Sequence, residues 1–117
     1  MIKFVILFHN PADQSSFEDA YNDFLAQVER MPHIQRRQVN SILGSPLGET
    51  TLYRALEVYF DDNAHMSEAL NSPPGQAAGS IIMSRFPAGE FEFYFAEVYE
   101  EAGAQTPQPP NQTENGG

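Results

Sequence analysis

The sequence predicts a ferredoxin-like α+β domain, β-α-β-β-α-β in chain order, with a four-stranded antiparallel sheet and both helical regions on one face. Three apolar runs rich in β-branched and aromatic residues and one more polar run indicate four strands, and two stretches between them show helical apolar spacing. The first strand is apolar on both of its alternating faces, but the helices of a single chain can cover only one face of the sheet. We therefore expect a second copy of the chain to cover the other face.

The first strand is predicted over Ile2–His9, and residues 10–13 (NPAD) have the composition of a turn. Ser15 or Ser16 is the expected cap of the helix that follows. Pro32 ends that helix, because proline cannot continue the hydrogen-bond ladder. Its apolar stripe, spaced by three or four residues, consists of Phe17, Tyr21, Phe24, Val28 and Met31.

Residues 34–43 form a weaker, more polar strand, as expected at a sheet edge. After a loop, Leu52–Phe60 forms a strong strand. One face is expected to carry Leu52, Leu56, Val58 and Phe60, and the other Tyr53, Ala55, Glu57 and Tyr59. In the expected order, this third strand lies at the centre of the sheet, beside the first strand and parallel to it.

The second helical region is expected to consist of two helices that meet at a corner. Residues 62–70 form the first helix, Ser72 caps the second, and Pro73 suits its first turn. The face of the second helix toward the sheet is formed by Ala77, Ala78, Ile81 and Ile82. The last strand, residues 91–99, has Phe91, Phe93 and Phe95 on one face and Tyr94, Ala96 and Val98 on the other.

Composition divides the chain into one domain, residues 1–101, and a polar tail, residues 102–117. The tail has almost no apolar content, so we expect it to be disordered.

The net charge of −10 and the absence of a basic run argue against nucleic acid and membrane surfaces as partners. The chain has no cysteine. The apolar run at the N-terminus is too short for a signal peptide, so a cytoplasmic protein is expected.

Four strings in the sequence together resemble the EthD-like proteins of the dimeric α/β-barrel superfamily. They are EVYFDD (57–62), NSPPGQAA (71–78), FPAG (86–89) and FAEV (95–98). The resemblance covers residues 1–101 and implies a barrel made by two sheets packed face to face, with the helices outside.

The resemblance implies no single activity. The EthD-like family takes its name from a role in degrading an alkyl ether fuel additive, where it accompanies an oxidising system. Relatives of similar fold include dehydratases, cyclases, lactone isomerases and cofactor-free monooxygenases that act on aromatic or polyketide-like compounds. Many family members carry a Thr-His-x-Pro-Leu element in the first helix. The matching residues here, 23–27, read DFLAQ, so that the family's histidine is absent.

His9, at the end of the first strand, is the one candidate for a catalytic base. Tyr59, Asp61, Glu90 and Glu92 are expected near it, and a carboxylate beside a histidine suits proton transfer near neutral pH. The alternative, that His9 bonds loop backbone at a strand end, is favoured about three to one, because a single histidine indicates a site weakly. His33 and His65 are expected to be solvated.

Arg54 lies among apolar residues in the third strand and needs a carboxylate or a ligand anion there. Arg36 and Arg37 on the neighbouring edge strand would add to an anion pocket. The favoured alternative is a structural ion pair with Glu57, Glu92 or Glu97, or an exposed position beyond the cover of the helices. The expected ligand-binding set, which combines this arginine with aromatic hydroxyls that can orient a planar apolar ligand, is Tyr21, Tyr53, Arg54, Tyr59 and Tyr94.

The residues leave two functions open at nearly equal weight. One is a small cofactor-free enzyme, with His9 as base and Arg54 holding an anionic oxygen, that acts on an aromatic or polyketide-like molecule. The other is a non-catalytic small-molecule binding or accessory protein, which the missing helix histidine favours. No metal-ligand spacing or nucleotide-binding glycine pattern occurs, so no cofactor is expected. The sequence does not allow a Ser-His-Asp triad to be assembled, and a haem-associated barrel ranks last because the helices offer no obvious axial histidine.

Overall fold

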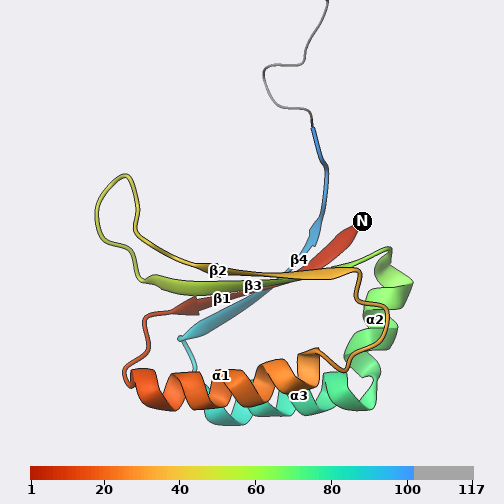
Figure 1. Cartoon of the computed structure of the whole chain (residues 1–117), viewed down its shortest axis with the longest axis horizontal. Coiled ribbons are helices and arrows are strands. Elements are labelled where there is room, and N and C mark those ends of the chain that lie inside the picture. Colours follow the sequence, from red (N-terminus) through yellow and green to blue (C-terminus); the bar gives the residue numbers. More distant parts are fainter. Residues whose placement is uncertain (102–117) are drawn as a thin grey trace, which may run out of the picture.

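The structure is a computed structural model that describes residues 1–101; the tail expected to be disordered, residues 102–117, lies outside the described residues. The elements, in chain order, are β1 (Ile2–His9), α1 (Gln14–Val28), β2 (Arg36–Ser41), β3 (Leu52–Phe60), α2 (Asn63–Asn71), α3 (Pro73–Arg85) and β4 (Phe91–Glu97). The four strands form one sheet in the order β2-β3-β1-β4 (Figure 1). The predicted ferredoxin-like α+β class is confirmed.

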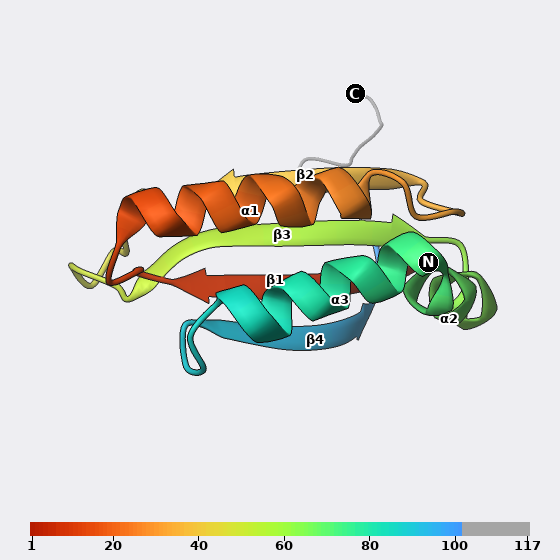
Figure 2. The same cartoon turned by 90° about the horizontal axis from the view of Figure 1, so that it is seen from below.

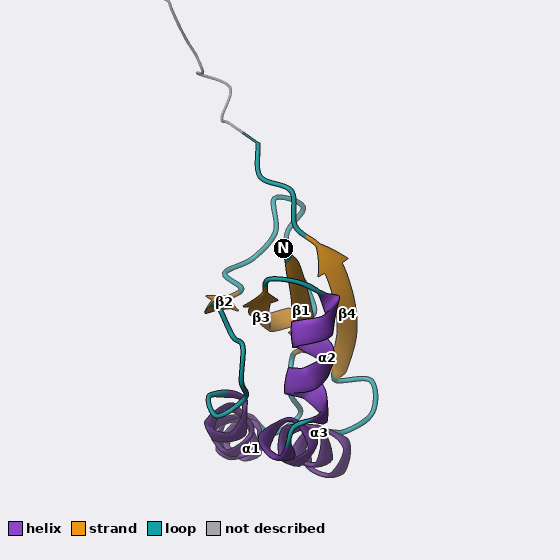
Figure 3. Cartoon of the chain, turned by 90° about the vertical axis from the view of Figure 1, so that its right-hand side faces the viewer, coloured by secondary structure: helices purple, strands orange, loops and turns teal. Residues whose placement is uncertain are grey.

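The helices and the sheet form two layers. Helices α1 and α3 lie side by side against one face of the sheet, α1 over β2 and β3 and α3 over β1 and β4 (Figure 2). The short helix α2 stands at one end between the two layers (Figure 3). Within the part of the chain that the structure describes, no helix covers the opposite face, which we call the open face.

The two central strands are β1 and β3, as predicted, but they are antiparallel, so the expected parallel pairing was wrong. Their register pairs Ile2 with Phe60 and Phe8 with Arg54. The reason lies in the connection between them. Helix α1 returns the chain so that β2 runs in the direction of β1, and the β2–β3 hairpin then reverses the chain once more.

The core is formed by the alternate residues of the strands that face the helices. Phe8 and Phe60 are fully buried, and Ile6, Leu56 and Val58 are buried to 1% exposure or less. Burying each such side chain stabilises the fold by about 1.5–3 kcal/mol. The predicted α1 stripe closes the core from the other side, and Phe17 stacks on Tyr21 with ring centroids 5.9 Å apart.

The cap of α1 is Asp13, and the expected cap at Ser15 or Ser16 was wrong. A carboxylate oxygen of Asp13 accepts hydrogen bonds from the backbone N–H groups of Ser15 (3.1 Å) and Ser16 (3.2 Å). These N–H groups have no carbonyl partner within the helix, so an acid one turn earlier satisfies both. The two serines are the donors rather than the cap.

The predicted corner between α2 and α3 is confirmed, and Ser72 caps α3 by accepting from the N–H of Gly75 at 3.2 Å. The corner also requires the glycine. A Cβ on residue 75 would lie 2.2 Å from the carbonyl oxygen of Ala69 and 2.6 Å from that of Leu70. The absence of a side chain therefore lets α3 start directly against the end of α2.

The edge strands are shorter than predicted. β2 spans Arg36–Ser41 instead of residues 34–43, and single hydrogen bonds from Gln35 to Tyr59 and from Ile42 to Tyr53 flank it. β4 ends at Glu97 instead of residue 99. Edge ladders fray in this way because only one side of the strand is paired.

A β-bulge interrupts the β1–β3 ladder near the end of β1. Phe8 pairs with Arg54, but His9 pairs with Leu52, which leaves Tyr53 as an extra residue. Tyr53 was expected on the face opposite Leu56. Because of the bulge, its side chain instead reaches α1 together with that of Arg54.

Among residues 1–101, none of the helices combines the length and the apolar character that crossing a membrane requires.

Candidate functional site

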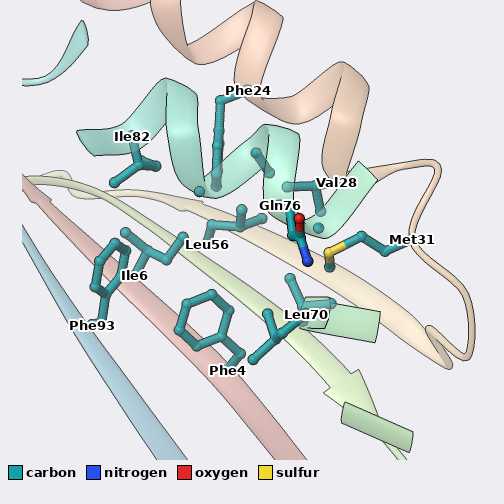
Figure 4. A pocket seen from close by; sticks show the side chains of 14 residues that line it. Phe4, Ile6, Phe24, Val28, Met31, Leu56, Leu70, Gln76, Ile82 and Phe93 are labelled. Atoms are coloured by element: carbon teal, nitrogen blue, oxygen red, sulfur yellow. The ribbon is translucent and has the colours of Figure 1, made fainter. Parts of the chain in front are cut away.

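A cavity of about 260 Å³ lies between the helix layer and the sheet. It occupies the half of that space next to α2, under the C-terminal half of α1 and the N-terminal half of α3 (Figure 4). The sheet contributes Phe4 and Ile6 of β1 and Leu56 of β3, and Met31 closes the end beyond α1. The remaining lining residues are Phe24, Val28, Val58, Leu70, Gly75, Gln76, Ala78, Gly79, Ile82 and Phe93.

The cavity opens between α3 and β4. Three of its lining residues are exposed, namely Gln76 and Gly79 on α3 and Phe93 on β4. A Cβ added to Gly79 would meet nothing within 4 Å. The missing side chain of Gly79 therefore leaves the opening clear, and Phe93, 41% exposed, forms the opposite edge.

The lining of this cavity is apolar. Among the described residues that form it, none is ionisable, and Gln76 alone has an amide, whose Nε2 donates to the carbonyl of Asn71 at 3.1 Å. Phe24, 3% exposed, stands at the position that the EthD-like resemblance aligns with the family's first-helix histidine. Here, therefore, a phenyl ring stands where that resemblance implies a titratable group, which leaves the cavity without a base.

Arg54 and Tyr53 meet at the other end of the helix–sheet interface, under the start of α1. The Arg54 guanidinium forms a two-pronged ion pair with Glu18 of α1, with Nη1 2.9 Å from Oε1 and Nη2 3.0 Å from Oε2. The Tyr53 hydroxyl donates to the same carboxylate at 2.6 Å. These bonds, led by the one from Arg54, lower the pKa of Glu18.

Tyr21 completes this cluster with its ring rather than its hydroxyl. The Arg54 guanidinium carbon lies 4.6 Å from the ring centroid, within cation–π range. The hydroxyl is buried and has no hydrogen-bond partner among residues 1–101, and burial raises the pKa of this phenol. The carboxylate already occupies the guanidinium, so the cluster is a structural bridge between α1 and β3.

The structure does not bring the other predicted anion-binding arginines to Arg54. Arg36 lies on the open face, where its guanidinium carbon is 4.2 Å from the centroid of the Tyr59 ring. Arg37 points to the helix side and pairs with Glu29 at 3.4 Å. They separate because successive side chains of a strand point to opposite faces of the sheet.

Tyr59 and Tyr94, the remaining members of the predicted ligand set, also lie on the open face. Tyr59 is 4% exposed and donates to Glu57 at 2.9 Å, beside an ion pair in which Lys3 Nζ is 2.9 Å from Glu57 Oε1. The hydrogen bond from Lys3 lowers the pKa of Glu57. Tyr94, 48% exposed, donates to Glu92. The five predicted ligand-binding residues are thus divided between the two faces of the sheet.

His9 lies at the end of the open face and is hydrogen-bonded through both ring nitrogens. Nε2 contacts the Glu92 carboxylate, and Nδ1 lies 3.0 Å from the hydroxyl of Thr51. Glu92 and the backbone of Glu90 are near His9, as expected. Tyr59 and Asp61 are not, because β3 runs antiparallel to β1 and Tyr59 pairs with Lys3 at the opposite end.

Two of these partners, Glu18 and Thr51, were not anticipated from the sequence. Glu18 follows Phe17 on the helix and borders the apolar stripe, a position from which an acid can reach the sheet. Thr51 lies in the loop just before β3, and its contact with His9 depends on the bulge, which has no clear sequence signal.

His33 and His65, expected to be solvated, lie with ring centroids 4.5 Å apart. Across the described residues, no group of three or more His, Cys, Asp or Glu side chains is arranged to hold a metal ion.

No family model matches the chain. A protein described as an uncharacterised 11.0 kDa protein in the thcB–thcC intergenic region of Rhodococcus erythropolis is 26% identical over 101 residues, covering 83% of this chain and 94% of that protein. The structure is similar to that of an EthD family protein from Bacillus halodurans, with a TM-score of 0.79 and 27% identity over 85% of this chain and 99% of the other. The match to this EthD family structure confirms the EthD-like resemblance.

More distant structures share the fold alone. A dimeric protein with a ferredoxin-like fold from Bacteroides fragilis aligns with a TM-score of 0.61 and 18% identity over 83% of this chain and 95% of its own. SnoaB, a cofactor-independent oxygenase from Streptomyces nogalater, aligns with a TM-score of 0.62 and 14% identity over 86% of this chain and 94% of its own.

Proposed function

We propose that this EthD-like protein is a homodimer that binds a small, neutral, apolar molecule, aromatic or polyketide-like, in the cavity between its helices and its sheet. The observation that carries the proposal is the apolar lining of this cavity, with Phe24 at the position of the family's histidine. Aromatic and aliphatic walls with a single amide at the opening are typical of a binding site for a planar apolar ligand.

The cavity selects against charged ligands. Moving an ion into such surroundings without a partner is strongly unfavourable, and the one polar lining side chain, Gln76, lies at the opening. A volume of about 260 Å³ has room for a compact molecule of a few rings. The proposed ligand is therefore neutral at the end that enters the cavity.

The alternative is a cofactor-free enzyme that uses His9 as base and Arg54 to hold an anionic oxygen. Two features favour binding over this mechanism. His9 and Arg54 contact groups on opposite faces of the sheet, and neither of them lines the cavity. The similarity to SnoaB shows a common fold and keeps the enzyme as the second candidate.

Binding is tested with 1-aminoanthracene, a neutral aromatic probe whose fluorescence rises in apolar surroundings. Gly79→Leu places a side chain at the opening and should weaken binding at least about tenfold, because contact area inside the cavity is lost. Ser80→Leu is the matched control, since residue 80 is exposed on the same helix and does not line the cavity. Equal affinities for wild type and Gly79→Leu would contradict the proposal. Turnover of an aromatic substrate that both His9→Gln and Arg54→Gln abolish would favour the enzyme.

The proposed dimer forms through the open face. The strands present Val5 and Leu7 of β1 and Ala55 of β3 there, around the Lys3–Glu57 ion pair. If two such faces pack together, the two sheets lie about 10 Å apart and these side chains are buried between them. The ferredoxin-like protein from Bacteroides fragilis is described as dimeric, which supports a dimer for this chain.

Sedimentation velocity at micromolar concentration tests the dimer. Wild type should sediment with twice the protomer mass. Leu7→Glu would bury a charge in the interface, so this variant should sediment with the mass of a single protomer. Leu47→Glu is the control, because Leu47 is 97% exposed in the β2–β3 loop. A wild-type protein that sediments as a single protomer would rule out the dimer without affecting the ligand proposal.

A further inference from the structure

Thr51, His9 and Glu92 form a hydroxyl–imidazole–carboxylate chain at the end of the open face. The Thr51 hydroxyl oxygen lies 3.0 Å from Nδ1 of His9, and Nε2 of the same ring contacts a carboxylate oxygen of Glu92. The other oxygen of Glu92 accepts from the Tyr94 hydroxyl. A nucleophile within hydrogen-bond reach of a base that a third group orients is the geometry of an activated hydroxyl.

The charges favour the tautomer that this chemistry needs. The hydrogen bonds from Tyr94 and then His9 lower the pKa of Glu92, so its carboxylate is ionised near neutral pH. An ionised carboxylate accepts the Nε2–H proton of the imidazole, which leaves the lone pair on Nδ1 free for the Thr51 hydroxyl. In the single protomer, the side chain of His9 is 25% exposed and Thr51 is exposed, so a substrate has access to both there.

A groove that contains a hydrogen-bond donor is lined by Thr50 and Leu52, the chain neighbours of Thr51. Asn10, Gly44, Gly48 and Thr50 are among its lining residues. The Nδ2 of Asn10 donates one proton to the Thr50 carbonyl at 3.3 Å and has a second proton to offer. An asparagine amide is one of the side chains that stabilise a developing oxyanion. Glu49, also in the groove, disfavours anionic substrates.

We propose that Thr51 is a nucleophile for acyl transfer from neutral, activated esters, with His9 as its base. The Thr51 oxygen forms a bond to the acyl carbon while its proton passes to Nδ1 of His9. The ester C–O bond then breaks, and the departing alcohol or phenol takes that proton. Water hydrolyses the acyl-threonine by the same steps. Glu92 is a positioning residue, and Asn10 donates to the oxyanion.

This site is separate from the proposed ligand cavity, and no residue belongs to both. His9 forms the last pair of the β1–β3 ladder, so the site lies at the margin of the open face rather than at its centre. The bulge beside His9 accounts for its position, because it ends the regular ladder where the loop carrying Thr51 returns to the sheet.

The experiment follows hydrolysis of p-nitrophenyl acetate by the full-length protein. Thr51→Val and His9→Gln should each lower the rate about 10- to 100-fold, because the nucleophile or its base is lost. Thr51→Ser should retain activity. Glu92→Gln should lower kcat and leave KM within about twofold, as expected when the imidazole is misoriented but the ester still binds. Asn10→Ala should lower the rate about tenfold.

His33→Gln is the matched control. His33 also pairs with a carboxylate, Glu68 at 2.8 Å, but its ring lies tilted against that of His65 rather than facing a hydroxyl. Its loss should leave the rate unchanged. Mass spectrometry of the quenched reaction should place one acetyl group on Thr51. Unchanged hydrolysis by Thr51→Val, equal losses in His9→Gln and His33→Gln, or acetylation only of Lys3 or Tyr94 would each overturn the proposal.

Discussion

Glu18 of α1 and Arg54 of β3 form the principal polar connection between the helix layer and the sheet, with both carboxylate oxygens 2.9–3.0 Å from guanidinium nitrogens. The Arg54 side chain is only 16% exposed, so removal of its partner leaves a poorly solvated cation. Glu18→Gln should lower the free energy of unfolding by roughly 1–2 kcal/mol, measured in urea. In a double-mutant cycle with Arg54→Gln, the losses in free energy of unfolding should be non-additive. Additive losses would show that the interaction between the two side chains contributes nothing to stability.

The same pair makes stability depend on pH. Because the folded-state pKa of Glu18 lies below its ordinary value of 4.5, the carboxylate contributes stability above that value and loses it as the pH falls. The stability difference between wild type and Glu18→Gln should therefore be complete at pH 6 and shrink as the pH decreases below about 4.5. Urea unfolding at several pH values measures it. A difference that stays constant down to pH 3 would contradict this assignment.

Gly75 and Gly79 on the same helix should respond oppositely to alanine. Gly75→Ala places a Cβ 2.2 Å from the Ala69 carbonyl oxygen, so the α2–α3 corner must shift, at a cost of roughly 1–3 kcal/mol. Gly79→Ala meets nothing within 4 Å and should raise stability by up to about 1 kcal/mol through helix propensity. Thermal unfolding of both variants measures the contrast, and equal effects would mean that the corner is not constrained.

The sequence predicts this corner because Ser72 and Pro73 are strong local signals. It also predicts the strands, the buried stripe of α1 and the α+β class, which follow from apolar periodicity. The relative direction of β1 and β3 and the β-bulge at Tyr53 depend on contacts between distant segments. Errors in those two features explain why Tyr59 was expected near His9 and why Thr51 was not expected as a partner of His9.

Tyr21 and Tyr53 differ in what their hydroxyls contact. The Tyr21 hydroxyl is buried without a partner, so Tyr21→Phe should leave stability unchanged or raise it by up to about 1 kcal/mol. The Tyr53 hydroxyl donates to Glu18 at 2.6 Å, so Tyr53→Phe should lower the free energy of unfolding by roughly 1–2 kcal/mol. Urea unfolding compares the two. A larger loss in Tyr21→Phe than in Tyr53→Phe would show that the Tyr21 hydroxyl has a partner, such as a water.

The position of a bound aromatic molecule decides whether the cavity is the binding site. In methyl-labelled protein saturated with 1-aminoanthracene, nuclear Overhauser effects from the probe should reach the methyl groups of Met31, Leu56 and Ile82, which line the cavity from three different parts of the chain. These contacts should be lost in Gly79→Leu. Contacts confined to Leu43 and Leu47 of the exposed loop, or to Val5 and Leu7 of the open face, would contradict binding in the cavity.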